Sequence, residues 1–426
     1  MRLPLPVLAC LLFSFSIHAQ VSITNNGTPP DPSSMLDVKD QSRGLLIPRM
    51  TMVQRDLITL PANALLIYQT DQDPGFYYNQ GTPVAPQWVS LSVMTDLDHI
   101  EDRIRIDSLP YTISSPGSYY VTADLSGSVG INISTSHVTL DLNGYSVRGL
   151  SGNNSEGIEV TAALTNITIR NGGVANWGRE GIKAVLAAHS SFSSLNIVSN
   201  SLDGLATGNN NFIYGVVAGN NSFDGIDAGE SNTLSHCIAS NNLSDGIEAD
   251  AGSSLLECTA RDNTEAGIRT TGTTSILNCS SSENNGHGFS CGAGTVVQNN
   301  SAYHNTRTGF FLYSASSASG NTSRNNGFNG FEWLNDCILE GNSASLNGMN
   351  GFYTTSKGGK ADNNTSNTNN GFGFRIQNAG GCLIIRNSTS GNGLGAFNVL
   401  PGNSFATVVT GATLNSNTNP FANFQL

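Results

Sequence analysis

Acidic side chains return at the same place in a repeated pattern along the middle of the sequence. Five carboxylates each stand directly before a glycine: Glu156, Glu180, Asp203, Asp224 and Asp245. Two more, Asp227 and Glu248, stand two residues after such a glycine. Carboxylates held close together repel one another, and a hard cation such as Ca²⁺ relieves that repulsion. Two interpretations stay open: a solvated stripe whose carboxylates cap turns, or a Ca²⁺ site with ligands from Asp203, Asp224, Asp227, Asp245 and Glu248.

A basic side chain follows these carboxylates. Arg269 stands two residues after Gly267, the position that Asp227 and Glu248 take in the two preceding repeats. A lyase acting on uronic acids needs a base, often Arg or Lys, and a cation that acidifies the sugar's α-proton. Arg269 is therefore a candidate catalytic residue, with a plain ion pair between repeats as the other interpretation.

An imidazole occupies the place of the repeated carboxylate one repeat later. His287 precedes Gly288 and is a candidate general acid or base. The Gly286-His287-Gly288 sequence resembles the Gly-His-Gly element of polygalacturonase-like hydrolases. Those enzymes also carry an Asn-Thr-Asp element, a pair of aspartates and an Arg-Ile-Lys element, which this sequence lacks. A hydrolase that inverts the configuration of the anomeric carbon needs two carboxyl groups that flank the glycosidic bond. The resemblance to this group is therefore incomplete.

Aromatic residues form the third candidate site. Phe311 and Tyr353 fall at equivalent positions two repeats apart, with Tyr313 and Trp333 nearby. Rings spaced by two coils, about 9.6 Å, are suited to stacking on the sugars of an extended glycan. The alternative is that the rings pack partly against neighbouring coils.

A strict period of 21 residues positions all of these side chains. Eight asparagines share it: Asn200, Asn221, Asn242, Asn263, Asn284, Asn305, Asn326 and Asn347. A glycine follows each asparagine by four residues, and an apolar residue comes next, changing from Ile to Phe at Phe289. A period of this length divides into three short strands and three turns, which predicts an all-β chain wound as a right-handed parallel β-helix of about a dozen coils. We expect the asparagines to form a hydrogen-bonded ladder and the phenylalanines to stack.

Composition excludes several classes of function. The chain has 426 residues and a net charge of −12, and its sequence has no basic run, so nucleic acid is not an expected partner. Residues 1–19 have the charged start and short apolar stretch of a secretory signal peptide. No later stretch is long enough to span a membrane. We therefore expect a protein that is secreted or held on the outer cell surface, with the periplasm as an alternative.

Three parts follow the predicted signal peptide. Residues 20–95 lack the period and are expected to form a small β-rich module, residues 96–112 a linker or cap, and residues 113–426 the β-helix. Three cysteines share one repeat position: Cys237, Cys258 and Cys279. They are either small buried side chains or members of a disulfide between neighbouring coils.

Particular segments resemble known families. The stretch Val138-Thr139-Leu140-Asp141-Leu142-Asn143-Gly144 resembles the opening coils of bacterial right-handed β-helix repeat proteins, which have a pectate-lyase-like fold. The stretch from Leu46 to Thr51 resembles an N-terminal module of secreted and tail-fibre-like surface proteins of Gram-negative bacteria. This second resemblance implies a homotrimer formed through the N-terminal module.

Two functions are compatible with these observations. The first is a non-catalytic surface or extracellular protein that is structural or binds a polysaccharide or surface glycan. The second is a Ca²⁺-dependent polysaccharide lyase, or a glycoside hydrolase, that acts on an acidic polysaccharide. We favour the first, because the hydrolase elements are missing and the set of lyase residues is incomplete.

Overall fold

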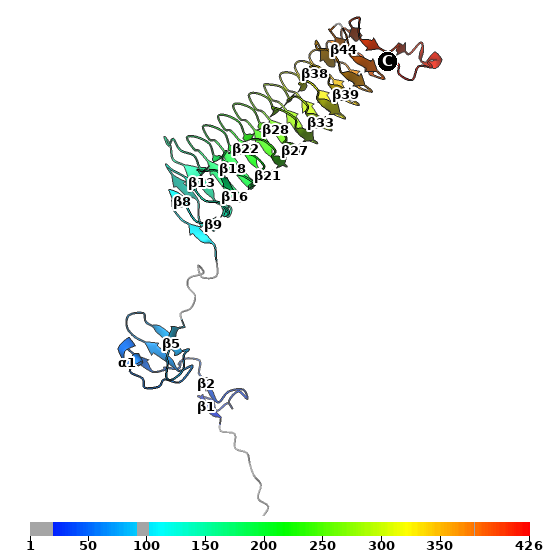
Figure 1. Ribbon diagram of the computed structural model, residues 1–426. Helices are drawn as coiled ribbons and strands as arrows, with labels where there is room; N and C mark the ends of the chain where they lie inside the picture. The colour runs from blue at the N-terminus through cyan, green and yellow to red at the C-terminus, as the bar shows by residue number, and fades with distance from the viewer. Residues whose placement is uncertain (1–19, 92–101, 379) are drawn as a thin grey trace, which may run out of the picture. The chain divides into compact units, whose positions relative to one another are not determined.

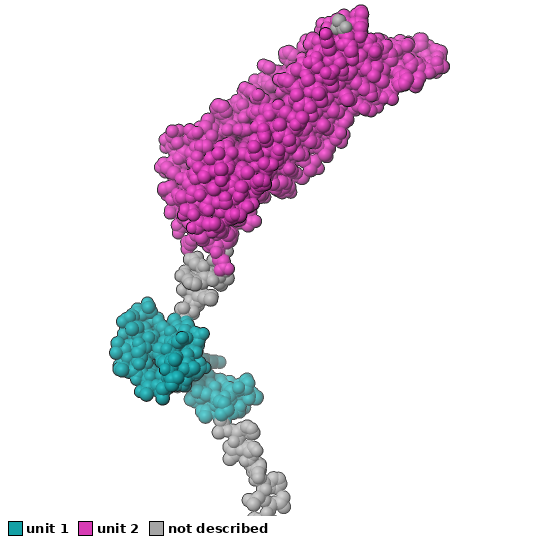
Figure 2. Space-filling view, in the orientation of Figure 1, with its two compact units in different colours: residues 1–100 teal, residues 101–426 magenta. Residues whose placement is uncertain are grey.

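The computed structural model describes residues 20–91, 102–378 and 380–426. The chain separates into two compact units, residues 1–100 and 101–426 (Figure 2). The described part of both units is built almost wholly from β-strands, with one short α-helix, α1 (Met52–Asp56), and a 3-10 turn at Leu414–Ser416. Within the described ranges, no helix is long and apolar enough to cross a membrane.

The first unit is a small β structure. Its strands β1 (Val21–Thr24) and β2 (Leu36–Lys39) pair in parallel. A separate four-stranded sheet has the following members: β3 (Arg49–Met50), β4 (Leu66–Gln69), β5 (Gly75–Asn79) and β6 (Trp88–Ser90). Helix α1 begins with a capping box, in which Thr51 and Gln54 each accept a hydrogen bond from the other's backbone N–H.

The second unit is a right-handed parallel β-solenoid of about 16 turns with coils of about 21 residues (Figure 1). The prediction of about a dozen coils was too low. The step from Ile131 to its partner Ile158 is 27 residues, so the first coils do not share the period that reveals the later ones. The predicted β-helix itself is confirmed.

Each regular coil contributes one strand to a 14-stranded parallel sheet and two strands to a 28-stranded sheet. The 14-stranded sheet comprises β8 (Tyr111–Ile113), β11 (Ile131–Ile133), β14 (Ile158–Val160), β17 (Ile182–Ala184), β20 (Leu205–Thr207), β23 (Ile226–Ala228), β26 (Ile247–Ala249), β29 (Ile268–Thr270), β32 (Phe289–Cys291), β35 (Phe310–Leu312), β38 (Phe331–Trp333), β41 (Phe352–Thr354), β44 (Phe372–Ile376) and β47 (Gly395–Val399).

The 28-stranded sheet comprises β7 (Ile104–Ile106), β9 (Gly117–Val121), β10 (Leu125–Gly127), β12 (Val138–Asp141), β13 (Ser146–Gly149), β16 (Ile167–Ala175), β19 (Ser191–Val198), β21 (Phe212–Tyr214), β22 (Val217–Gly219), β24 (Thr233–Ser235), β25 (Ile238–Ser240), β27 (Ser254–Leu256), β28 (Thr259–Arg261), β30 (Ser275–Leu277), β31 (Ser280–Ser282), β33 (Val296–Gln298), β34 (Ser301–Tyr303), β36 (Ser317–Ser319), β37 (Thr322–Arg324), β39 (Ile338–Glu340), β40 (Ser343–Ser345), β42 (Lys360–Asp362), β43 (Thr365–Asn367), β45 (Leu383–Ile385), β46 (Ser388–Ser390), β48 (Ser404–Phe405), β49 (Val408–Thr410) and β50 (Asn423–Gln425). A further short pair joins β15 (Leu164–Thr165) to β18 (Ala187–Ala188).

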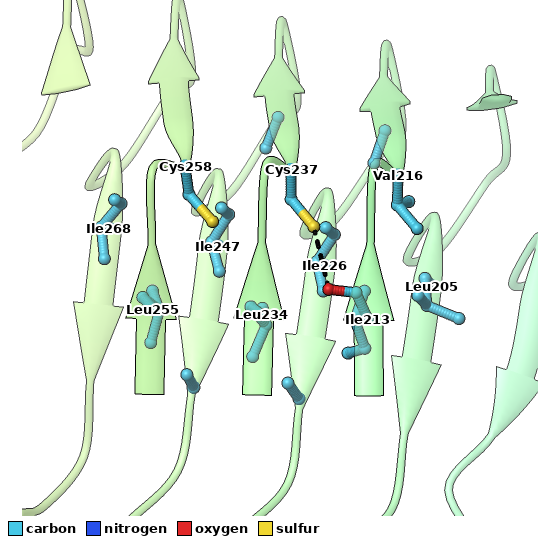
Figure 3. Close-up of a cluster of buried hydrophobic side chains, with 14 of the residues drawn as sticks. Leu205, Ile213, Val216, Ile226, Leu234, Cys237, Ile247, Leu255, Cys258 and Ile268 are labelled. Carbon is cyan, nitrogen blue, oxygen red and sulfur yellow. Dashed lines mark hydrogen bonds between the residues drawn. The ribbon is translucent and has the colours of Figure 1, made fainter. Parts of the chain in front are cut away.

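Strands of equal register stack along the solenoid axis. Ile226 of β23 pairs with Ile247 of β26, which pairs with Ile268 of β29. Because successive side chains of a strand point to opposite faces, the first and third residues of these strands face inward and the middle one faces outward. Figure 3 shows the resulting interior, where these isoleucines lie opposite a row that includes Leu234 and Leu255.

The predicted asparagine ladder is confirmed in the atomic contacts. Asn263 Oδ1 accepts hydrogen bonds from the backbone N–H and the side-chain Nδ2 of Asn242, at 3.1 and 3.0 Å. Its own Nδ2 donates to Asn284 Oδ1 at 2.9 Å and to the backbone carbonyl of Ala239 at 3.2 Å. The oxygen and the amide nitrogen of each buried asparagine are therefore hydrogen-bonded, and the ladder keeps successive coils in register through a turn.

The glycine that follows each ladder asparagine is required for space. A Cβ on Gly225 would lie 2.6 Å from both the Gly246 carbonyl oxygen and Asn242 Nδ2. The φ of Gly225 is not positive, so its backbone conformation does not itself require glycine. The close approach of consecutive coils excludes a side chain instead.

The three cysteines at one repeat position line the interior as free thiols. All six cysteines of the described residues are unpaired and buried. Cys237 Sγ lies 3.7 Å from the carbonyl oxygen of Ile213 (Figure 3), and Cys279 Sγ accepts the Cys258 backbone N–H at 3.4 Å. Four asparagines continue the same position in later coils: Asn300, Asn321, Asn342 and Asn364. The thiols thus take the place of amides in a second ladder that the sequence analysis missed.

The phenylalanine stack fills the C-terminal half of the core. The rings of Phe310, Phe331 and Phe352 are nearly parallel, and their centroids are 4.8 and 4.9 Å apart. These rings are buried, and the spacing equals that of stacked strands, so each ring rests on the next.

Candidate functional site

The acidic stripe, defined as Asp203, Asp224, Asp227, Asp245 and Glu248, has two rows. In the first row each carboxylate caps the following coil: Asp203 Oδ1 accepts the Asp224 N–H at 2.9 Å, Asp224 Oδ1 accepts the Asp245 N–H at 2.7 Å, and Asp245 Oδ1 accepts the Ala266 N–H at 2.7 Å. In the second row, Asp227 and Glu248 pair in register on the outer side of β23 and β26. The first row therefore stabilises the backbone as well as carrying charge.

Burial and mutual repulsion raise the pKa of these carboxyls. Burial is the main cause, and it brings the pKa of Asp203 and of Asp245 to about 6. Burial, with the charges of nearby carboxylates, brings the pKa of Asp227 and of Glu248 to about 7. The pKa of Asp224 is raised by burial as well. The stripe is thus only partly ionised at neutral pH.

Arg269 ends the second row. It pairs in register with Glu248, so the predicted series Asp227, Glu248 and Arg269 lies on one line along the sheet. Its guanidinium is 3.4 Å from Asp245 Oδ2 and 3.7 Å from Glu248 Oε1, with about half of the side chain exposed. The Glu248 carboxylate, followed by that of Asp245, raises the pKa of Arg269. The residue is both an ion-pair partner and a cation open to solvent.

A cleft of about 470 Å³ opens beside Arg269. This Arg269 cleft is lined by Asp245, Thr264, Glu265, Ala266, Arg269, Asn285, Gly286, His287, Ser290, Arg307 and Tyr313. A smaller hollow of about 280 Å³ adjoins it and shares Arg269, Ser290 and Tyr313. The cleft therefore brings together the two predicted catalytic residues, one carboxylate of the stripe and one predicted aromatic.

His287 borders the cleft as a half-buried, neutral imidazole. Burial, with a smaller contribution from the charge of Arg307, lowers its pKa, which favours the uncharged ring at neutral pH. Its Nδ1 is buried and has no hydrogen-bond partner among the described residues. The ring lies 5.1 Å from that of Phe311, which in turn meets Tyr313 at 5.2 Å nearly edge to face.

Two charged residues that line the cleft, Glu265 and Arg307, were not among the predicted site residues. Glu265, Gly286 and Arg307 fall 21 residues apart, so they stack at one corner of the solenoid beside the predicted residues. The same period that placed Arg269 could have found Arg307. It places a second cation at the cleft, opposite in charge to Glu265.

The structure places the four residues of the predicted aromatic site in different environments. Phe311 and Tyr353 lie on the outer line of the 14-stranded sheet, two coils apart and half-buried. The Arg375 guanidinium sits 5.8 Å from the centre of the Tyr353 ring, while Tyr313 is 44% exposed. The assignment of Trp333 to glycan binding was wrong: it is the third residue of β38, faces inward and is only 1% exposed.

The stripe does not form a preorganised metal centre. Within the ranges that the structure describes, no group of three or more His, Cys, Asp or Glu side chains converges in a geometry able to hold a metal ion. Three of the carboxylates already accept backbone hydrogen bonds, and Asp245 also faces Arg269. The residues present therefore do not fit a Ca²⁺ site made by this chain alone.

Comparison with known proteins gives one family match. Residues 23–101 match the family model of a phage tail like trimerisation region. No curated protein matches the chain at a significant level. The match covers most of the first unit and less than half of the chain.

The comparison with solved structures gives several matches at low identity. The A-module of the Azotobacter vinelandii mannuronan C-5 epimerase AlgE4 has 15% identity and a TM-score of 0.48, and the match covers 68% of this chain and 90% of that one. The periplasmic alginate epimerase AlgG has 12% identity and a TM-score of 0.39, with 74% of each chain covered. Pectate lyase Pel9A has 12% identity and a TM-score of 0.32, with 63% of this chain and 68% of that one covered. At such identity no catalytic residue is carried over to this chain.

Proposed function

We propose that the β-helix binds an acidic polysaccharide along the outer face of the 14-stranded sheet, with a uronate carboxylate held in the Arg269 cleft. The observation that carries the proposal is the cleft itself, because it places the cations of Arg269 and Arg307 beside the rings of His287 and Tyr313. Guanidinium groups pair with carboxylates through two parallel hydrogen bonds, and exposed aromatic rings stack on sugars. A cleft lined by both is suited to a charged sugar.

The raised pKa values of the carboxyls in the stripe support the proposal that Arg269 binds a ligand carboxylate. Burial raises the pKa of Glu248, which faces Arg269, to about 7, so this carboxyl is only partly ionised at neutral pH. A ligand carboxylate competes with a weak internal partner rather than with a fully charged one. Arg269 is thus available to a ligand although it lies within an ion pair.

The test is a panel of polysaccharides measured against matched variants. Full-length protein should bind uronate-containing chains and not their neutral or carboxyl-reduced counterparts, and the Arg269→Gln/Arg307→Gln double variant should lose at least about tenfold in affinity. Arg261→Ala is the control, because Arg261 is exposed on β28 of the other sheet and pairs only with its neighbour Asp262 among the described contacts. Equal binding by the double variant and the wild type would refute the proposal.

A second function is favoured by the state of His287. A neutral imidazole beside two guanidinium groups is the arrangement that β-elimination requires: Arg269 neutralises the uronate carboxylate, and His287 removes the proton α to it. The electron pair then forms a double bond in the sugar as the glycosidic oxygen leaves, and Tyr313, which lines the same cleft, is the proposed donor of a proton to that oxygen. Ultraviolet-absorbing unsaturated product, lost in His287→Asn, would establish a lyase, whereas new saturated reducing ends would indicate a hydrolase.

We propose a role for Ca²⁺ only as a bridge between carboxylates of the protein and of the ligand. The carboxylates of the stripe do not complete a cation site alone, but the carboxylate of a bound uronate supplies the missing oxygen ligands. The polysaccharide panel is therefore run with Ca²⁺ and with a chelator. A loss of binding in chelator that Asp245→Ala reproduces would support bridging, and unchanged binding in both would exclude it.

We further propose that the protein is exported and acts as a homotrimer at or outside the cell surface. The first unit carries several strongly exposed apolar residues, among them Leu45 and Leu46 at 66% and 74%. Together with Tyr68 and Phe76 they border an apolar hollow of about 280 Å³. A small unit with this much exposed apolar surface is stabilised by association with further copies, in agreement with the family match.

A further inference from the structure

One corner of the solenoid carries polar side chains on residues with left-handed backbone. Asn166, His189, Asn210 and Ser231 occupy equivalent places in four successive coils, with φ of 56°, 50°, 59° and 58°. The next coil has Gly252 there, with φ of 77°. Asn and His are enriched among the non-glycine residues that adopt this conformation, so the backbone accommodates the amides and the imidazole of the earlier coils and holds their side chains at the corner.

These side chains border a cleft on the outer side of the 28-stranded sheet. The corner cleft, of about 470 Å³, is lined by Asn166, Ile167, Thr168, His189, Ser190, Ser191, Asn210, Asn211, Phe212, Ser231 and Thr233. No Asp, Glu, Lys or Arg is among them. The exposed side chains of His189 and Asn210 make no hydrogen bond within the part of the chain that the structure describes, so their polar atoms are available to a ligand.

An aromatic platform forms one end of this cleft. Phe212 is 46% exposed, and its ring is nearly parallel to that of Tyr214, which is 44% exposed, with the centroids 6.1 Å apart. Both rings project from the outer side of β21, while Ile213 between them is buried in the core. Two exposed rings beside uncharged amides combine an apolar surface with hydrogen-bonding groups.

We propose that the corner cleft binds a neutral sugar residue of a glycan. Phe212 stacks on the C–H face of the sugar ring, and Asn210 and His189 exchange hydrogen bonds with its hydroxyl groups. The coils repeat about every 4.8 Å, so the polar side chains of Asn166, His189, Asn210 and Ser231 offer a row of partners to a chain lying along the axis. This cleft uses strands of the 28-stranded sheet and does not depend on the Arg269 cleft.

The experiment measures binding of neutral oligosaccharides to the full-length protein by calorimetry and by saturation-transfer NMR. The panel contains gluco-, manno- and xylo-oligosaccharides. Phe212→Ala should weaken the binding oligosaccharide by about tenfold, and Asn210→Gly by about fivefold, since glycine keeps the backbone conformation and removes only the amide. Asn278→Gly is the matched control, because Asn278 is an exposed asparagine with φ of 54° at another corner.

The outcomes separate this proposal from that of the Arg269 cleft. Binding that falls in the Phe212 and Asn210 variants, and is unchanged in Asn278→Gly and in the Arg269→Gln/Arg307→Gln variant, supports a neutral-sugar site at the corner. Absence of binding to every neutral oligosaccharide, or binding that Phe212→Ala leaves intact, overturns it. Loss of binding in the arginine variant alone also overturns it, because the sugar is then held in the other cleft.

Discussion

Arg269 Nη1 lies 3.4 Å from Asp245 Oδ2 in the preceding coil, while Oδ1 of the same carboxylate accepts the backbone N–H of Ala266 at 2.7 Å. One side chain thus performs two tasks: it satisfies a buried backbone donor, and it balances the cation at the mouth of the cleft. Asp245 is only 1% exposed, so its contact with Ala266 is buried, whereas Arg269 on its other side is about half exposed.

The two tasks can be separated by substitution. Asp245→Asn keeps an oxygen acceptor for the Ala266 N–H but removes the charge beside Arg269, so its free energy of unfolding should stay within about 1 kcal/mol of wild type. Asp245→Ala leaves the N–H buried without a partner and should cost about 1–3 kcal/mol. In a chelator, where no cation bridges the stripe and the ligand, we expect Asp245→Asn to bind acidic polysaccharide more tightly than wild type. Urea denaturation and calorimetric titration measure the two effects, and weaker binding by Asp245→Asn would contradict the role given to Arg269.

The raised pKa values predict that stability depends on pH. In the unfolded chain Asp titrates near 3.9 and Glu near 4.3, whereas in the fold Asp203 and Asp245 titrate at about 6 and Asp227 and Glu248 at about 7. Between these values the folded chain holds protons that the unfolded chain has released. Protonation therefore stabilises the fold, fully below about pH 4, and this stabilisation is lost as the pH rises through 6 and 7.

Denaturation midpoints measured from pH 5 to pH 8 should accordingly fall as the pH rises. The Asp227→Asn/Glu248→Gln variant should show a flatter profile, because neither side chain caps the backbone and both lose their charge. The control is Glu283→Gln, an exposed carboxylate outside the stripe. A profile that is equally steep in the double variant would mean that other groups cause the dependence.

A buried rung of the asparagine ladder should be sensitive to substitution. Asn263→Ala removes the acceptor of two Asn242 donors and the donor to the Ala239 carbonyl. Asn284 Oδ1 loses one of its two donors and keeps the backbone N–H of residue 263. Each unsatisfied buried group costs about 1–3 kcal/mol, and we expect a total loss of about 2–5 kcal/mol in the free energy of unfolding. Asn285→Ala, one residue after the next rung and exposed, should change stability by less than about 0.5 kcal/mol. Comparable losses in both variants would show that the ladder does not carry the register.

The fold was predictable because residues that are one period apart in the sequence are neighbours in adjacent coils. A step of 21 residues brings Asn242 next to Asn263, and the same step sets Glu248 beside Arg269. Trp333 was misplaced although the alternation contained the answer. It stands two residues after the inward-facing Phe331, and residues two apart in a strand share a face.

The clefts were not predictable by the same reasoning. A periodic pattern predicts which residues stack on one another. The depth of a cleft depends instead on how far individual side chains extend and on where neighbouring coils differ. Tyr313 follows the last residue of β35 and lines the Arg269 cleft. Asn210 becomes a candidate ligand-binding residue only because the exposed ring of Phe212 lines the same cleft. Such contacts join positions that differ from coil to coil, so the period carries no information about them.

The exposed apolar residues of the first unit predict its mode of assembly. Leu45→Asp/Leu46→Asp places two charges at positions that are 66% and 74% exposed, where a monomer tolerates them but a buried interface does not. Light scattering on the full-length protein should give three times the chain mass for wild type and the mass of a single chain for the variant. Leu243→Asp, at a position of the β-helix that is 63% exposed, should remain trimeric. A monomeric wild type, or a variant that still forms trimers, would show that these leucines do not form the interface, since two buried aspartates in each copy could not be accommodated there.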